Sequence, residues 1–182
     1  MDALHYLSQI DSSNFESEAL ATFQRQYAQI PVYRQYVDLR GLQHPKTLSE
    51  IPFLPISFFK THDVFIGNKP EIHFESSGTT ADVVSKHWVS DLSLYEQSFN
   101  QCFNLFYGNP SEYCIIGLLP SYLERSHSSL VYMVDHLIRL SGHAQSGFYL
   151  DDFNDLNNVL KSLELQQQKT ILIGVSFALM DF

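Results

Sequence analysis

Apolar residues recur at helical spacing in the first forty residues of the chain. Between residues 15 and 30 they lie three or four positions apart, after three polar residues at 12–14 that can cap a helix. Pro31 suits the first turn of a second helix, and Gly41 suits its end. The pattern therefore predicts two consecutive helices, at about 15–30 and 31–41.

The helical pattern breaks after Gly41. Pro52 and Pro55 exclude a continuous helix or strand between residues 47 and 67. We expect a crossing loop there, with one short helical turn at residues 57–60.

From Glu71 onward, short apolar segments alternate with amphipathic ones. Residues 170–175 form a continuous apolar run, which is typical of a strand buried on both faces. The alternation predicts an α/β fold in which N-terminal helices are followed by a mainly parallel sheet covered by helices. The predicted strands are 71–75, 86–89, 113–119, 147–150 and 170–175, and helices are predicted to start near residues 91, 128 and 153.

The predicted helix from residue 91 ends at Gly108, before Asn109 and Pro110. Its apolar residues share one face of a 3.6-residue period, and we expect that face to be buried. The residues on this face are Leu92, Tyr95, Phe99, Cys102, Phe103 and Phe106.

Composition limits the classes of function. Only 17% of the 182 residues are charged, the net charge is -9, and lysine and arginine form no run. This balance argues against sequence-independent binding of nucleic acid, which depends on neutralising phosphates. Two cysteines are too few for a disulfide framework, and neither a secretory signal nor a membrane-spanning run is present. We therefore expect a cytoplasmic protein without a membrane span.

The most distinctive polar segment is SSGTT, residues 76–80, directly after the predicted strand 71–75. Gly78 allows successive backbone N–H groups to point into one concavity, and four hydroxyls add donors for phosphate oxygens. Lys86 could supply positive charge nearby. The segment is not a Walker loop, because GxxxxGK[ST] is absent. Composition alone favours the simpler alternative, a solvent-exposed turn.

The order of three segments along the chain supports a phosphate-binding role for SSGTT. SSGTT resembles the phosphate-binding loop of adenylate-forming enzymes, the acyl-CoA synthetase and phenylacetate–CoA ligase superfamily. Residues 117–133 and 169–182 match the superfamily's later strand–helix segments in the same order. The run Ser85, Lys86, His87 after SSGTT is similar to the acyl-protein synthetase (LuxE-type) family. The resemblance covers residues 45–182.

The resemblance implies a division of the chain and a function. Residues 1–44 would be an N-terminal helical segment, and 45–182 part of the large N-terminal domain of adenylate-forming enzymes. The implied activity is ATP- and Mg²⁺-dependent activation of a carboxylic acid to an acyl-adenylate. A fatty acid is the substrate that the resemblance favours. The acyl group would then pass to a protein thiol or to CoA.

The resemblance also implies site residues, although it assigns no catalytic residue. The implied nucleotide-binding residues are Ser76, Ser77, Gly78, Thr79, Thr80, Lys86 and His87. The implied residues of the acyl or nucleotide pocket are Tyr122, His127 and Phe177, each of which could instead serve packing alone. Cys102 and Cys114 lie in apolar segments and are poor candidates for an acyl-carrying thiol.

The chain departs from the family pattern in three places. Ala81 stands where a glycine is usual, and Val83 and Val84 replace a proline–lysine pair. The acidic motif, the hinge, the C-terminal domain and the acyl-carrying cysteine of the family would all follow residue 182. We therefore expect an N-terminal fragment, incomplete at its C-terminus, which shows little or no turnover by itself.

The sequence leaves three alternatives to the ligase. GVSFA, residues 174–178, imitates the nucleophile elbow of a hydrolase, but the second glycine is replaced and only residues 179–182 follow the segment. The eight histidines include no HExxH motif, which disfavours a metal site. The third alternative is a non-catalytic module that binds nucleotide or protein and covers its apolar edge in a homodimer.

Overall fold

The structure is a computed structural model that describes residues 9–76, 84–119, 127–150 and 153–182. The chain forms two compact units, Met1–Gln97 and Ser98–Phe182. Within the described residues, no helix has the length and apolar character needed to cross a bilayer. The division at residue 44 that the resemblance implies stays a prediction.

Two helices open the described chain, as the sequence predicted. Helix α2 spans Phe15–Gln29 and helix α3 spans Pro31–Arg40. Pro31 occupies the first turn of α3, where its missing N–H costs no hydrogen bond. Gly41 ends the helix in a left-handed conformation, with φ of 68°.

The two helices bury a small apolar core. Val37 is fully buried, and the Tyr33 hydroxyl donates a hydrogen bond of 2.9 Å to the Pro52 carbonyl oxygen, which ties α3 to the loop that follows. That loop holds two short 3₁₀ helices, η1 (Leu48–Glu50) and η2 (Ile56–Lys60), and η2 confirms the predicted helical turn. The core consists of Phe23, Ile30, Tyr33, Val37 and Ile51.

The first two strands differ from the predicted parallel sheet. Strands β1 (Ile72–Glu75) and β2 (Lys86–Val89) pair antiparallel and form a separate two-stranded sheet. Residues 76–85 join them directly, and this connection is too short for the crossover that parallel strands require. The prediction of a mainly parallel sheet therefore holds only for the second unit.

Helix α4 spans Leu92–Tyr107. Asp91 precedes it, and the Asp91 Oδ1 atom accepts hydrogen bonds from Ser93 Oγ (2.6 Å) and from the Leu94 N–H (3.3 Å). The Ser93 hydrogen bond lowers the pKa of the Asp91 carboxyl below its usual value. An ionised carboxylate at this position satisfies a free N–H and interacts favourably with the helix dipole.

The predicted buried face of α4 is only partly correct. Phe99 and Phe103 are buried, but Cys102 is exposed and Phe106 is largely exposed. Cys102 lies one residue before Phe103 and so about 100° away around the helix. Phe106 lies in the last turn of α4, outside the buried stretch.

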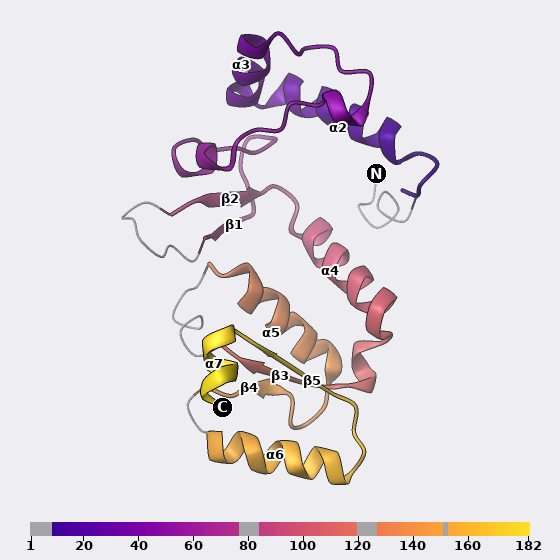
Figure 1. Ribbon diagram of the computed structural model, residues 1–182, viewed down its shortest axis with the longest axis vertical. Coiled ribbons are helices and arrows are strands. Elements are labelled where there is room, and N and C mark those ends of the chain that lie inside the picture. The colour runs from indigo at the N-terminus through magenta and orange to yellow at the C-terminus, as the bar shows by residue number, and fades with distance from the viewer. Residues whose placement is uncertain (1–8, 77–83, 120–126, 151–152) are drawn as a thin grey trace. The chain divides into compact units, whose positions relative to one another are not determined.

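The second unit alternates strands and helices, which confirms its predicted α/β class. The three strands are parallel, in the order β4-β3-β5, so that β3 lies in the middle. Helices α5 and α6 lie on opposite sides of the strands in Figure 1. The elements are η3 (Pro110–Glu112), β3 (Cys114–Leu118), α5 (Ser129–Ser141), β4 (Gly147–Phe148), α6 (Phe153–Leu165), β5 (Thr170–Gly174) and α7 (Ser176–Asp181).

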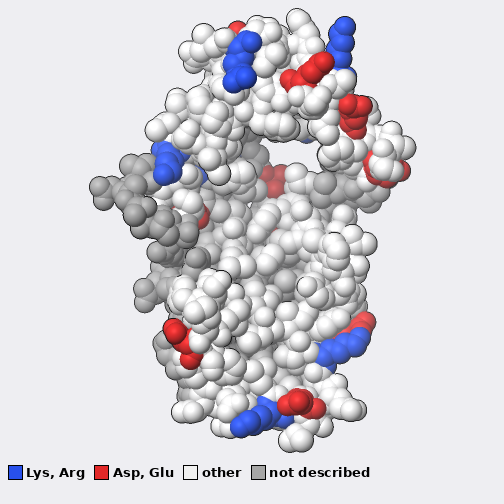
Figure 2. All heavy atoms as spheres, in the orientation of Figure 1, with Lys and Arg blue, Asp and Glu red and all other residues white. Residues whose placement is uncertain are grey.

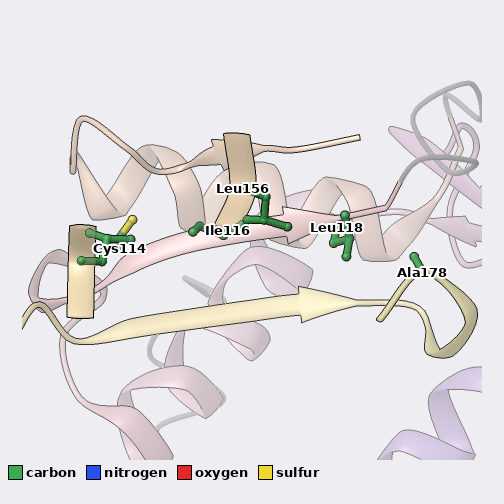
Figure 3. Close-up of a cluster of buried hydrophobic side chains, with 6 residues drawn as sticks. Cys114, Ile116, Leu118, Leu156 and Ala178 are labelled. Carbon is green, nitrogen blue, oxygen red and sulfur yellow. The ribbon is translucent and has the colours of Figure 1, made fainter. Parts of the chain in front are cut away.

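The central strand β3 organises the core of this unit. All five of its residues are buried, and Cys114, Ile116 and Leu118 lie on the face that packs against α6 and α7. Figure 3 shows these three side chains along β3, with Leu156 of α6 and Ala178 of α7 in the same cluster. A strand buried on both faces explains the continuous apolar run in its sequence.

Gly117 and Gly147 form a matched pair that tests the packing of β3. A Cβ atom at Gly117 would lie 2.6 Å from Phe148 Cδ1 and 3.1 Å from Val134 Cγ1, whereas one at Gly147 would meet no atom within 4 Å. We expect Gly117→Ala to lower the free energy of unfolding by about 1–3 kcal/mol, because overpacking forces its neighbours to move. Urea unfolding curves of the two variants measure the difference. Equal stability of Gly117→Ala and Gly147→Ala would contradict this packing.

Candidate functional site

The first candidate region is the end of the β1–β2 hairpin. The Ser76 N–H donates to the Ser85 carbonyl oxygen at 3.0 Å, and the Ser85 N–H donates to Ser76 Oγ at 3.1 Å. The first bond continues the antiparallel pairing one step beyond Glu75 and Lys86, and the second joins a backbone N–H to a side-chain hydroxyl. The hydroxyl hydrogen of Ser76 can still donate to an anion, because its oxygen serves as the acceptor. Four predicted site residues, Ser77, Gly78, Thr79 and Thr80, lie outside the described residues.

Lys86 and His87 lie on opposite faces of this hairpin, because successive side chains of a strand alternate. The His87 ring stacks on Phe59, with centroids 5.7 Å apart. The Lys86 ammonium instead lies 5.9 Å from the centroid of the Trp88 ring. Ser76 and Ser85 form the next pair beyond Glu75 and Lys86, so the strand alternation places them on the face of His87 and opposite Lys86.

The Lys86 face of the hairpin carries a group of polar and aromatic side chains. In the strand register, Glu75 is the partner of Lys86 and His73 is the partner of Trp88. His73 Nε2 lies 3.3 Å from Glu75 Oε1, and the rings of His73 and Trp88 have centroids 4.6 Å apart. Trp88 Nε1 donates to Asp63 Oδ1 at 2.8 Å. Both carboxylates on this face therefore have partners of their own.

The sequence prediction did not include His73, Glu75 and Trp88 on the face of Lys86, nor Asp63 as the partner of Trp88. The alternation in IHFE and KHWV contains the signal for three of them, because an antiparallel register places residues 73, 75, 86 and 88 on one face. Asp63 is 25 positions from Trp88, and no local pattern indicates their hydrogen bond.

The second candidate region is the carboxyl edge of the parallel sheet. The chain leaves β3 toward α5, which packs on one face, and leaves β5 toward α7, which packs on the other. Open α/β sheets bind ligands where neighbouring strands diverge in this way. His127 and Phe177 follow β3 and β5 at this edge, and Phe177 is 51% exposed. Tyr122, the third residue predicted for the pocket, lies outside the described residues.

The capping of α5 and the path of β4 define this edge further. Ser128 Oγ accepts the Val131 N–H at 3.3 Å and caps α5, next to the half-buried His127. The Tyr149 N–H donates to the Gly117 carbonyl oxygen at 2.9 Å and extends the pairing of β4 with β3. Burial, with Asp155 nearby, raises the pKa of the Tyr149 hydroxyl, so this group is a neutral donor at neutral pH.

The segment around Ser176 has the strand–serine–helix arrangement that suggested a hydrolase. Ser176 follows β5 and starts α7, and its side chain is exposed. Among the residues that the structure describes, Ser176 Oγ has neither a histidine nor a carboxylate as a hydrogen-bond partner. The local geometry thus gives no support for an activated nucleophile.

The side chains that bind metals are dispersed over the described chain. No group of three histidine, cysteine or carboxylate side chains comes together in the ranges 9–76, 84–119, 127–150 and 153–182. Charged side chains are sparse on the face shown in Figure 2, where both signs occur. An anion at either candidate region would therefore depend mainly on neutral donors.

Comparisons with protein-family models, with curated proteins and with solved structures found no match to this chain.

The two cysteines differ in accessibility, which allows a chemical test of the structure. Cys102 is exposed, whereas Cys114 is fully buried in β3 and burial raises the pKa of its thiol. We expect one thiol to react at once with a colorimetric disulfide reagent at pH 8 and the second to react only in denaturant. The variant Cys102→Ser should lose the fast phase. Two equally fast thiols in the native protein would contradict the buried position of Cys114.

Proposed function

We propose that this chain carries the nucleotide-binding part of an ATP-dependent acyl-activating ligase of the adenylate-forming type. The observation that carries the proposal is the closure of the β1–β2 hairpin by Ser76 and Ser85. This closure joins residues 76 and 85, the first of which begins the hydroxyl-rich segment 76–80. Cytoplasmic location and an acyl-protein synthetase specificity are part of the same proposal.

The proposed role of the segment is to hold the β- and γ-phosphates of ATP. Ser76, Ser77, Thr79 and Thr80 offer hydroxyl donors, and Gly78 lets the backbone N–H groups turn toward an anion. The chain carries a net charge of -9, so hydroxyl and N–H donors supply most of the binding without a cluster of cations. Mg²⁺ would bridge the phosphates and offset their charge.

The proposed reaction joins a carboxylic acid to the α-phosphate of ATP. A carboxylate oxygen attacks the α-phosphorus, the bond from that phosphorus to the bridging oxygen breaks, and pyrophosphate leaves. The chain lowers the barrier by orienting the two reactants and by donating hydrogen bonds to the leaving pyrophosphate. His127 and Phe177, with Tyr122, are the proposed residues of the acyl or nucleotide pocket, and His87 is a proposed nucleotide-binding residue. A thiol of a protein or of CoA would accept the acyl group.

A second candidate function is supported by the exposed apolar side chains of α7. Phe177 and Met180 are 51% and 84% exposed, and β5 is an edge strand of the described sheet. Surfaces of this kind bind other proteins. A module that binds protein without binding nucleotide would show no affinity for ATP in the unmodified chain.

The affinity of Thr79→Val for ATP tests the proposed function. Valine keeps the shape of threonine and removes the hydroxyl, so we expect about a 5- to 30-fold weaker dissociation constant for Mg–ATP. Isothermal titration calorimetry measures the constant. The control is Thr47→Val, since Thr47 Oγ1 lies 3.1 Å from Ser49 Oγ, away from the hairpin. Equal affinity of Thr79→Val and Thr47→Val for Mg–ATP would indicate that residues 76–80 are an ordinary turn without a role in nucleotide binding.

A further inference from the structure

Strand β5 has one open edge. Within the described residues it pairs with β3 alone, and all five of its residues are partly accessible, whereas all five residues of β3 are buried. Natural sheets protect such edges with charged side chains or proline, because an unprotected edge pairs with other strands. The sequence of β5, TILIG, contains neither a charged residue nor a proline. The strand is therefore suited to pairing with a further strand.

The backbone groups at this open edge belong to alternate residues of β5. The Cys114 N–H donates to the Lys169 carbonyl oxygen at 2.8 Å, which directs that carbonyl toward β3. The polar backbone groups of successive strand residues point to opposite sides, so those of Thr170, Leu172 and Gly174 point away from β3. The N–H and carbonyl groups of these three residues are thus directed toward a partner strand.

The surroundings of this edge carry little charge. From Leu165 to Met180 the sequence contains one charged residue, Lys169. Its ammonium lies 2.6 Å from Glu112 Oε2 and 5.5 Å from the centroid of the Tyr113 ring, and both partners directly precede β3. The lysine is therefore engaged on the side of β3 and does not protect the open edge. Because the chain has a net charge of -9, two copies repel each other over most of their surface, and this neutral edge avoids the repulsion.

Exposed apolar side chains lie at both ends of β5. Leu165, the last residue of α6, is 87% exposed and precedes the strand. Phe177 and Met180 belong to α7, which follows the strand, and they are 51% and 84% exposed. Helices α6 and α7 pack on the same face of the sheet. An antiparallel second copy of β5 would bring the end of α6 in one copy beside α7 of the other, so that these apolar side chains meet.

We propose that β5 is the interface of a two-fold symmetric homodimer, in which it pairs antiparallel with β5 of a second copy. Leu172 is the central residue of the strand and lies on the two-fold axis. Thr170 then faces Gly174 of the partner subunit. Ile171 faces Ile173 of the partner subunit, which sets β-branched side chains beside each other. This register joins the open backbone groups in hydrogen-bonded pairs and makes every contact twice, as a closed two-fold interface requires.

The helices contribute to the size of this interface as well as the strands. Stable protein–protein interfaces bury about 1,200–2,000 Å² in total, and two five-residue strands alone fall short of this area. The exposed apolar side chains of α6 and α7 add to it from both copies. An unrelated strand would satisfy the backbone groups of the edge but would not bring a second set of these side chains. The dimer does not depend on the proposed nucleotide site.

Sedimentation equilibrium of the unmodified chain measures the dimer and its dissociation constant. We expect Leu165→Glu to raise that constant about 10- to 100-fold, because it removes an apolar contact and brings a carboxylate into the interface at two symmetry-related places. Leu39→Glu is the matched control, since Leu39 is 82% exposed near the end of α3 in the first unit. This control should leave the dissociation constant unchanged.

Hydrogen exchange of the β5 amides tests the strand pairing itself. The Leu172 N–H points to the open edge, whereas the Ile173 N–H points to β3. Dilution from dimer to monomer should speed exchange at Leu172 on the order of tenfold or more and leave Ile173 nearly unchanged. Thr170→Pro removes a donor from the open edge without removing a bond to β3, so it should weaken the dimer. Circular dichroism checks that this variant folds.

Several results would overturn the proposed dimer. A monomer at every concentration would mean that a second copy does not occupy the edge and would leave it to a strand of another protein. A dimer in which Leu172 exchanges as fast as in the monomer would place the interface elsewhere, as would a dimer that Leu165→Glu does not weaken. Masses above that of a dimer would exclude a closed two-fold interface. If Thr170→Pro does not fold, the exchange of Leu172 in the unmodified chain decides the outcome.

Discussion

The two hydrogen bonds between Ser76 and Ser85 fix the geometry on which the first candidate site depends. They hold residues 76 and 85 together at the end of the described hairpin. They also continue the register that pairs Glu75 with Lys86 and His73 with Trp88. A shift of that register by one residue would turn Lys86 to the opposite face, away from its ring.

A different constraint shapes the second unit. Strand β3 is buried on both faces, so each face must be covered by helices, and the chain crosses from α5 to α6 to achieve this. The same crossing makes the chain segments after β3 and β5 diverge at the carboxyl edge. The second candidate site is therefore a consequence of how β3 is buried. Its side chains, His127 and Phe177, lie next to or within the helices that cover the two faces of β3.

Local patterns were sufficient to predict most elements of the fold. Helices α2 and α3 followed from apolar spacing with Pro31 and Gly41, and β3 and β5 followed from continuous apolar runs. These signals are local because each reports which face of one element is buried. The direction of pairing of β1 and β2 was not predicted, since a four-residue strand contains too little alternation to indicate its partner.

The candidate site was predictable to a smaller extent. The sequence grouped Ser76, Lys86 and His87 in one nucleotide site, but the alternation of β2 turns Lys86 to the face opposite His87. Trp88 and Asp63 depend on a contact across 25 positions, which the fold creates. Cys102 was expected on the buried face of α4 but is exposed. A broad apolar stripe on a helix does not show which of its residues the core covers.

The central proposal is that nucleotide binds at the end of the β1–β2 hairpin. Backbone amide chemical shifts test this position most directly. The experiment titrates the ¹⁵N-labelled chain with Mg–ATP and follows the shift of each backbone amide. If the hairpin end binds the phosphates, the largest changes will fall on residues 76–86, around the Ser76 and Ser85 amides. Changes confined to residues 98–182, or no changes at saturating ATP, would contradict the account.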